Sequence, residues 1–258
     1  MYNRRGVSFL ALTLGLGVIA VATLGATAPS TTAPVSYRDA LVARLAAEYR
    51  DPSLAATVVT GLNDDLIAKL EAKVPRAEVV SSPFLAYRPP RVAGGRVGSV
   101  LVFAFGNRTA ADGSLVPGPT NEALAKVTRG FVAKHHVPVY AQTEIARILI
   151  AEGVKDVVSI DPVIGADGKV VYLSTAGVAA QVVDKARAAG HKLGTVGVIG
   201  FADHAVRCVL TARAAGMTAA VPKGVVLPAT YDAQSSQSWT RSRAVYLPTD
   251  LIGRITTL

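Results

Sequence analysis

Asp203, His204 and Arg207 are the residues of this chain whose types and spacing best fit a chemical site. They follow the apolar stretch GVIGFA and open the segment HAVRCVLTARAAGM, which has helical periodicity. Histidine can exchange a proton near neutral pH, and arginine binds phosphates and carboxylates. His204, Arg207 and Thr211 share one face of the expected helix. Because a cationic pair in the first turn opposes the helix dipole, we expect an anion to meet it.

Two interpretations of this stretch are open. In the first, His204 and Asp203 are candidate catalytic residues, with Asp203 orienting the imidazole and Arg207 contacting an anionic substrate. In the second, the helix start is only solvated, and Asp203 is its N-cap, accepting backbone N–H groups of the first turn. Cys208 stands among apolar helical neighbours and is expected in the core. It is the single cysteine, which excludes an intrachain disulfide.

Strands and helices alternate over the part of the chain that carries these residues. The expected strands are GSVLVFAFG (98–106), VPVYA (137–141), DVVSI (156–160), KVVYLS (169–174) and TVGVIGF (195–201), followed by the short apolar run GVVLP (224–228). The expected helices span 121–135, 143–152, 175–189 and 204–215. This alternation predicts right-handed crossovers in a parallel sheet. The expected fold class is α/β, a Rossmann-like three-layer sandwich with a mostly parallel sheet.

Ligands of such sheets bind beyond the carboxyl ends of the strands. Polar residues at that edge give the expected ligand-binding set, which is Gly106, Asn107, Gln142, Ser174, Thr175, His204 and Arg207, with Arg108 beside it. The chain has no G-x-G-x-x-G in the turn after a strand, no G-x-x-x-x-G-K-[ST] and no G-x-S-x-G. None of the four histidines forms H-x-H or H-E-x-x-H, so no metal site is predicted and no cofactor is indicated.

The amino-terminal sequence MYNRRGVSFLALTLGLGVIAVATLGATAPSTTAP predicts export. Arg4 and Arg5 precede the apolar stretch from Val7 to Leu24, which as a helix is about 27 Å long, enough to cross a bilayer core. Residues 1–28 are either a signal peptide cleaved near Ala28 or an uncleaved anchor, and residues 29–36 are a linker. The length of the stretch favours the anchor, with the domain facing outward; cleavage would make it secreted. The paired arginines also fit twin-arginine export.

Residues 37–96 are predicted to form an amino-terminal helical cap in front of a domain at 97–258. Ser36 and Asp39 form a capping-box pattern before the first helix. Pro52 begins a second helix that stops at Gly61, and Asn63 caps a third that ends before Pro75.

Charge is scattered along the chain rather than clustered. There are 27 basic and 18 acidic residues, a net charge of +9, and half of the residues are hydrophobic. This composition is typical of a folded domain with mild attraction to anionic surfaces. Because a nucleic-acid-binding protein needs a clustered basic face, no nucleic-acid partner is expected.

The stretches YLSTAGVAAQVVDKARAAG and GVIGFADHAVRCVLTARAAGM resemble the core of the YdcF-like family, which includes the SanA and ElyC types of the bacterial envelope. In that family a strand ends in a histidine, an arginine follows three residues on, and the helix closes at a glycine. Here those residues are His204, Arg207 and Gly216. The polar loop 105–107 and the helix start at Ser174 and Thr175 also fit, and the resemblance covers roughly residues 98–250.

The resemblance implies a Rossmann-like domain, often behind an amino-terminal membrane segment, with a role in envelope or peptidoglycan-related processes. The expected function is to bind or act on a small anionic ligand, such as a cell-wall or polyprenyl-phosphate precursor. The alternative is a non-catalytic binding or scaffold protein at the outer face of the cytoplasmic membrane. The sequence leaves open whether the chain is an enzyme, and it names no protein partner.

Overall fold

The computed structural model describes residues 35–165 and 170–258 of the chain, and residues 35–258 form one compact unit. The predicted signal peptide or anchor, and with it the expected amino-terminal hydrophobic helix, lies outside the described residues. Among the helices that the structure describes, none is both long and apolar enough to span a membrane.

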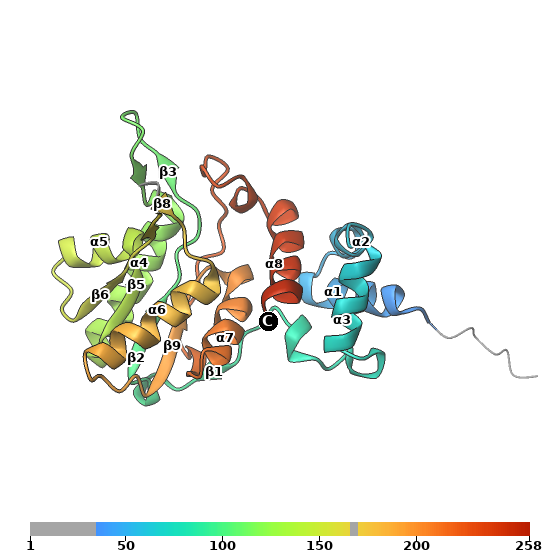
Figure 1. Ribbon diagram of the computed structural model, residues 1–258, viewed down its shortest axis with the longest axis horizontal. Coiled ribbons are helices and arrows are strands. Elements are labelled where there is room, and N and C mark those ends of the chain that lie inside the picture. The colour runs from blue at the N-terminus through green and yellow to red at the C-terminus, as the bar shows by residue number, and fades with distance from the viewer. Residues whose placement is uncertain (1–34, 166–169) are drawn as a thin grey trace, which may run out of the picture. The chain divides into compact units, whose positions relative to one another are not determined.

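A six-stranded sheet lies at the centre of the α/β part (Figure 1). Its strands are β1 (Arg91–Val92), β2 (Ser99–Val102), β5 (Val139–Gln142), β6 (Val157–Ile160), β9 (Thr195–Ile199) and β10 (Thr218–Pro222). The order across the sheet is β1-β10-β9-β2-β5-β6, and all neighbouring pairs are parallel. The predicted α/β class with a parallel sheet is confirmed, and the arrangement is consistent with a Rossmann-like fold.

β2 and β9 lie side by side in the middle of the sheet because both are apolar enough to be covered on both faces. Every residue of β2 is buried, and in the register Val100 lies opposite Gly197 and Val102 opposite Ile199. The chain leaves β2 toward β5 on one side and later returns through β9 on the other. The strand order therefore reverses beside β2, which is where open parallel sheets bind ligands.

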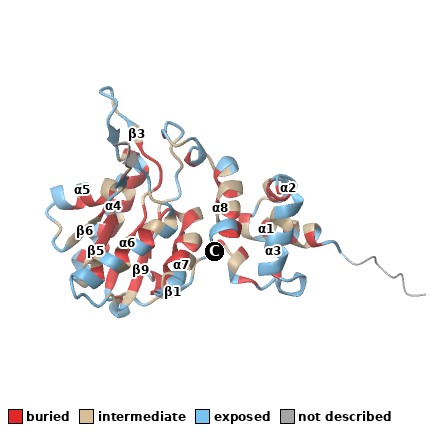
Figure 2. Cartoon of the chain, viewed as in Figure 1, coloured by how far each residue is buried: buried red, intermediate tan, exposed pale blue. Residues whose placement is uncertain are grey.

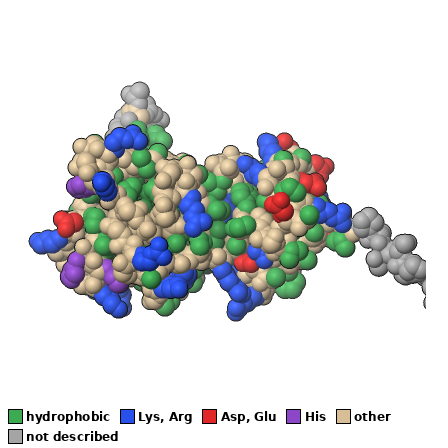
Figure 3. Space-filling view, turned by 90° about the horizontal axis from the view of Figure 1, so that it is seen from below, with side chains coloured by type: hydrophobic (Ala, Val, Ile, Leu, Met, Phe, Trp, Pro, Cys, Tyr) green, Lys and Arg blue, Asp and Glu red, His purple; other side chains and the backbone are tan. Residues whose placement is uncertain are grey.

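Four helices flank the sheet, namely α4 (Gly118–His135), α5 (Thr143–Ala151), α6 (Thr175–Ala188) and α7 (Ala205–Ala214). α4 packs on α5, and α6 packs on α7. The buried residues of Figure 2 lie in the strands and along the helix faces that meet them. Lys and Arg side chains are dispersed over the face shown in Figure 3.

A second core joins the two ends of the described chain. α1 (Tyr37–Tyr49), α2 (Pro52–Thr60) and α3 (Asp64–Lys73) begin at the predicted caps Ser36, Asp51-Pro52 and Asn63. They pack against α8 (Arg243–Thr257), whose Leu247 and Leu251 are buried among their apolar side chains. α8, which was not predicted from the sequence, therefore completes the core of α1–α3, while β1 (Arg91–Val92) belongs to the central sheet.

Other segments differ from expectation. GVVLP is not a strand; the last sheet strand is β10, whose alanines gave a weak strand signal but are buried between β9 and β1. KVVYLS contributes only β8 (Val170–Val171), which pairs antiparallel with β7 (Val163–Ile164) outside the central sheet. A similar hairpin joins β3 (Arg108–Thr109) to β4 (Leu115–Val116). Residues 103–106 leave the sheet after β2.

Candidate functional site

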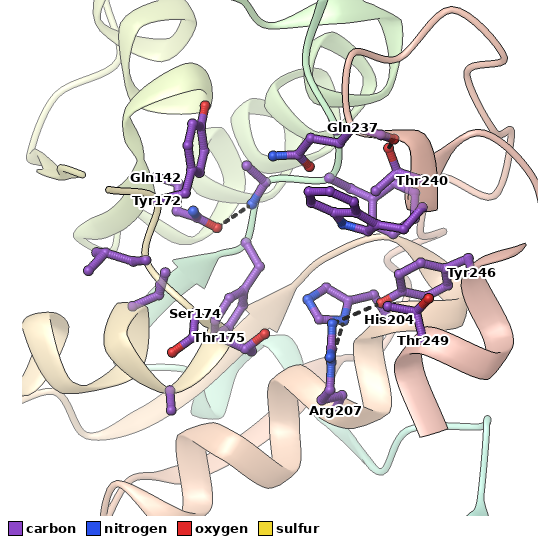
Figure 4. Close-up of a pocket in the computed structure, with 18 of the residues that line it drawn as sticks. Gln142, Tyr172, Ser174, Thr175, His204, Arg207, Gln237, Thr240, Tyr246 and Thr249 are labelled. Atoms are coloured by element: carbon purple, nitrogen blue, oxygen red, sulfur yellow. Dashed lines mark hydrogen bonds between the residues drawn. The ribbon is translucent and has the colours of Figure 1, made fainter. Parts of the chain in front are cut away.

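A pocket of about 370 Å³ opens at the carboxyl ends of β2, β5 and β9 (Figure 4). Its wall includes Gly106, Gln142, Glu144, Tyr172, Ser174, Thr175, His204, Arg207, Gln237, Trp239, Thr240, Tyr246 and Thr249. Six of the seven predicted ligand-binding residues thus come together in one cavity. Their role in binding stays a prediction, and the seventh, Asn107, does not line the pocket.

Asn107 instead connects two segments next to the pocket through hydrogen bonds to Tyr172 and Ser236. Its side chain is buried, and its amide nitrogen donates to the Tyr172 hydroxyl oxygen at 2.8 Å. Its carboxamide oxygen and its backbone carbonyl both accept hydrogen bonds from Ser236. Arg108 does not line the pocket either, because it forms a bidentate pair with Asp232, with both N···O distances at 2.8 Å.

The loop after β2 is held in place by two side-chain amides. The backbone N–H of Ala104 donates to Gln142 Oε1 at 2.8 Å, and that of Phe105 donates to Asn121 Oδ1 at 2.8 Å. Asn121 Nδ2 donates in turn to the Gly106 carbonyl oxygen at 2.6 Å. Gln142 therefore has at least a structural role, since it fixes the backbone at the pocket floor.

The first turn of α6 lies at the wall of the pocket. Ser174 is the N-cap, as its position predicts, and its hydroxyl accepts from the Gly177 N–H at 3.1 Å. The backbone N–H groups of Thr175 and Ala176 have no hydrogen-bond partner in the described part of the chain, and both residues line the cavity. Free N–H groups at the positive end of a helix are favourable partners for an anion.

His204 is buried at the same cavity and is neutral at neutral pH. Only 5% of the residue is exposed, and the rings of Phe103, Phe105 and Tyr246 surround it. Burial and the adjacent Arg207 guanidinium lower the pKa of the imidazole to about 4. The expectation that His204 and Arg207 form a cationic pair is therefore wrong.

The hydrogen bonds of His204 also define its tautomer. Arg207 Nε lies 3.3 Å from Nδ1 and donates to it, whereas the distance of 3.6 Å from Nδ1 to Asp250 Oδ1 exceeds a hydrogen bond. Nδ1 is thus the acceptor, and the proton of the neutral ring is on Nε2. Figure 4 shows the other ring nitrogen facing across the cavity toward Thr175.

Asp203 neither caps α7 nor orients His204, which corrects both predicted roles. A 3-10 turn (Ala202–His204) precedes α7, and neither element has a side-chain cap hydrogen bond. The turn points the Asp203 carboxylate away, where it accepts from the Tyr231 hydroxyl at 2.8 Å and from Arg243 Nε at 3.0 Å. Cys208 is buried, as predicted, and burial raises the pKa of its thiol.

The carboxylate that meets Arg207 is Asp250 of α8. Its Oδ1 lies 3.1 Å from Arg207 Nε and accepts from the Tyr246 hydroxyl at 3.2 Å, while its Oδ2 lies 2.7 Å from Arg254 Nη2. Asp250 and Arg254 are both fully buried. Burial alone would raise the pKa of Asp250, but the attraction of Arg254 and Arg207 outweighs it and lowers that pKa to about 2. The anion expected to meet Arg207 is therefore, within the protein, the carboxylate of Asp250.

The cluster of Arg207, Arg254, Asp250 and His204 has one positive charge that no carboxylate of the cluster neutralises. One carboxylate faces two guanidinium groups, and with His204 neutral the cluster has a net charge of one positive unit. Arg254 is sequestered, because it donates to the carbonyls of Phe84 and Ala86 and lies over the Tyr87 ring. Arg207 keeps 17% of its side chain exposed and lines the pocket. The excess positive charge is therefore at the cavity wall.

The only carboxylate of the described pocket wall is that of Glu144, which accepts the Tyr172 hydroxyl. Glu144 stands in the first turn of α5, and Tyr172 precedes the start of α6. The cavity thus has an acidic group on the α5 side, while the positive groups Arg207 and the α6 terminus belong to the other side. An anionic group would bind between α6 and α7.

The contribution of the carboxyl-terminal segment to the pocket was not predicted from the sequence. Tyr246, Asp250 and Arg254 are spaced by four residues and share one face of α8. That spacing was a usable signal, but Pro248 inside the segment argued against a helix. The pocket residues of the preceding loop, from Gln237 to Thr240, carry no pattern of their own.

The fold and the site together define an α/β domain with a polar pocket at the carboxyl edge of a parallel sheet, with Arg207 on one side of the pocket and Glu144 on another. Within 35–165 and 170–258, no group of three or more His, Cys, Asp or Glu side chains is placed to hold a metal ion. No family model, no curated protein and no solved structure gives a significant match to this chain.

Proposed function

We propose that this chain is an envelope-associated, YdcF-like, Rossmann-like domain that binds a small anionic molecule in the pocket, such as a cell-wall or polyprenyl-phosphate precursor. The observation that carries the proposal is the excess positive charge on Arg207 in the same cavity as two free N–H groups of α6. The envelope location rests on the basic and apolar pattern of residues 1–28, which predicts export and attachment to the outer face of the cytoplasmic membrane.

Three groups of the pocket wall would bind the anion. The Arg207 guanidinium supplies charge, the amides of Thr175 and Ala176 supply directed donors, and His204 Nε2–H supplies a neutral donor. Oxyanions such as phosphate favour this combination of charged and backbone donors. With its pKa lowered to about 4, His204 is neutral at neutral pH, and because Nδ1 accepts from Arg207 its Nε2–H is the hydrogen-bond donor.

Thermal unfolding of the full-length protein in sodium phosphate tests the proposal. A ligand that binds the folded state raises Tm, so Tm should be higher in phosphate than in sodium chloride of equal ionic strength. Phosphate also stabilises folded proteins non-specifically by exclusion from their surface, so Arg207→Gln should make the difference smaller by the contribution of the site. Arg213→Gln is the matched control on the same helix, because Arg213 donates to the Ala219 carbonyl and does not line the pocket.

An equal response of the two arginine variants would contradict the proposal, and so would a wild-type Tm that is the same in both salts. An equal response to phosphate in the wild-type protein and in both arginine variants is the result expected of the alternative, a scaffold protein without a small-molecule site.

A further inference from the structure

The chain's single tryptophan lines the same pocket as the positive groups. Trp239 is 46% exposed, although it is the largest apolar side chain of the sequence. An aromatic ring that the protein leaves uncovered in a cavity offers a large contact area to a ligand at low entropic cost.

Trp239 belongs to a turn that is firmly held. The 3-10 turn Ser238–Thr240 is closed by the Thr240 hydroxyl, which donates to the Gln237 carbonyl and lies 2.8 Å from the Ser235 hydroxyl. Arg241 Nε also donates to the Ser235 carbonyl at 2.6 Å. The indole is therefore presented on a preorganised turn, and binding would cost little additional ordering of the protein.

The anion subsite does not rest on the α6 terminus alone. His204 is 5% exposed, and its Nε2 has no hydrogen-bond partner in the part of the chain that the structure describes, yet it faces the cavity (Figure 4). An N–H group that opens into a cavity and has no partner within the described protein can donate to a ligand or to water. A phosphate group would therefore bind at one position, where the amino terminus of α6, the His204 imidazole N–H and the Arg207 guanidinium meet the cavity.

Apart from Glu144, the remaining polar side chains of the wall are uncharged hydroxyls and amides. They belong to Gln142, Tyr172, Ser174, Thr175, Gln237, Thr240 and Thr249. Such groups match the alternating hydroxyls of a sugar ring, whose apolar face can lie on an indole. A long isoprenoid chain would instead need an extended apolar groove, and the cavity volume of about 370 Å³ fits a ligand of one or two rings.

Resting on the proposed function, we infer that the pocket takes a phosphorylated sugar, with the phosphate between the α6 terminus, His204 and Arg207 and the sugar ring on Trp239. In this arrangement the phosphate contributes binding energy through its charge. The sugar ring contributes selectivity for sugar phosphates over other phosphates.

Fluorescence of Trp239 in the full-length protein tests this inference directly, because no other tryptophan contributes. Glucose 1-phosphate, inorganic phosphate and glucose are titrated separately. The sugar phosphate should change the emission and bind with a Kd about tenfold lower than that of phosphate, since an aromatic contact is worth roughly that factor. Glucose alone should bind more weakly than either.

Variants separate the two parts of the ligand by thermal shift, which does not need the tryptophan. In Trp239→Ala the response to glucose 1-phosphate should fall to that of phosphate, while the response to phosphate persists. Val245→Ala is the control, because Val245 is equally exposed at 48% on the neighbouring α8 but does not line the pocket.

Each contrary result has a distinct meaning. Equal Kd values for phosphate and glucose 1-phosphate would overturn the sugar assignment and leave the proposed function standing. Tighter binding of adenosine monophosphate or of farnesyl phosphate would replace the sugar by a nucleobase or an isoprenoid. Absence of binding by all of these probes would overturn the inference and the proposed function together.

Discussion

At the scale of single residues, one buried carboxylate sets the state of its neighbours. Asp250 lies between Arg207 and Arg254, and a lone charge at a fully buried position would be strongly destabilising. The carboxylate is therefore required by both guanidinium groups, while burial and the nearby positive charge together keep His204 neutral. The same cluster that stabilises the junction of α7 and α8 gives the pocket its charge and its Nε2–H donor.

The lowered pKa of His204 predicts a specific pH dependence of stability. The unfolded imidazole takes up a proton near pH 6.5, whereas the folded one does so only near pH 4. The unfolded state thus binds more protons in this window, so stability is complete above pH 6.5 and is lost as pH falls toward 4, by about 3 kcal/mol at most. Denaturant titrations at a series of pH values measure this slope.

His204→Gln should flatten the curve between pH 6.5 and 4, because glutamine does not titrate. His191→Gln, at an exposed histidine, should keep the wild-type slope. A wild-type curve that is already flat in this window, or a slope unchanged in His204→Gln, would refute the assignment of a buried neutral imidazole.

At the scale of elements, the loop after β2 fits only because it contains a glycine. Gly106 has φ +73°, and a Cβ atom there would lie 2.7 Å from Ser235 Oγ and 2.8 Å from Thr240 Oγ1. This close approach brings the turn that carries Trp239 against the pocket floor. Gly113, in the β3–β4 hairpin, has φ +81° but no atom within 4 Å of its Cβ position.

The two glycines form a matched pair of substitutions. Gly113→Ala should cost about 1 kcal/mol from backbone strain alone. Gly106→Ala carries the same strain plus the steric overlap, so it should cost about 1–3 kcal/mol more and shift the Trp239 emission. Chemical denaturation and fluorescence measure both effects. Equal costs at the two positions would show that the loop and the Ser235–Thr240 segment are not in close contact.

The elements that local signals define were predictable from the sequence. Ser36, Pro52 and Asn63 start helices through interactions within one turn, and the sheet strands β2 and β9 stand out as apolar runs. β10 and α8 were not predicted because tertiary contacts, and not a local pattern, stabilise them. The alanines of β10 are buried between two parallel strands. α8 tolerates Pro248 and buries Asp250 and Arg254.

The candidate site divides in the same way. The rule that ligands meet the carboxyl edge of a parallel sheet located Gly106, Gln142, His204 and Arg207 from strand positions. Ser174 and Thr175 line the cavity through the start of α6, although the strand expected before them is not part of the central sheet. The charge state of His204 and Arg207 was not predictable, because it depends on Asp250, which lies more than forty residues away in the sequence and approaches only after α8 has packed. The role of Asp203 failed for a related reason, since its partners Tyr231 and Arg243 are also distant in sequence.

At the scale of the whole described unit, α8 connects two hydrophobic cores. Tyr246 belongs to the core of the α/β part, whereas Leu247, Leu251 and Ile255 belong to the core formed with α1–α3. Arg243 adds a hydrogen bond from Nη1 to the Tyr49 carbonyl oxygen at 2.8 Å. A helix shared in this way should couple the unfolding of α1–α3 to that of the sheet and its pocket.

Leu45→Ala tests this coupling. Leu45 is fully buried in α1 and does not line the pocket, so its truncation should cost about 2–5 kcal/mol. If α8 makes the unit cooperative, the midpoint of unfolding should fall equally by far-ultraviolet circular dichroism and by Trp239 fluorescence, which reports on the pocket. Val80→Ala, at a 75% exposed position, should leave both midpoints within error. Should the dichroism midpoint fall while the Trp239 midpoint stays, the helices would unfold on their own, and α8 would hold the pocket charges without help from α1–α3.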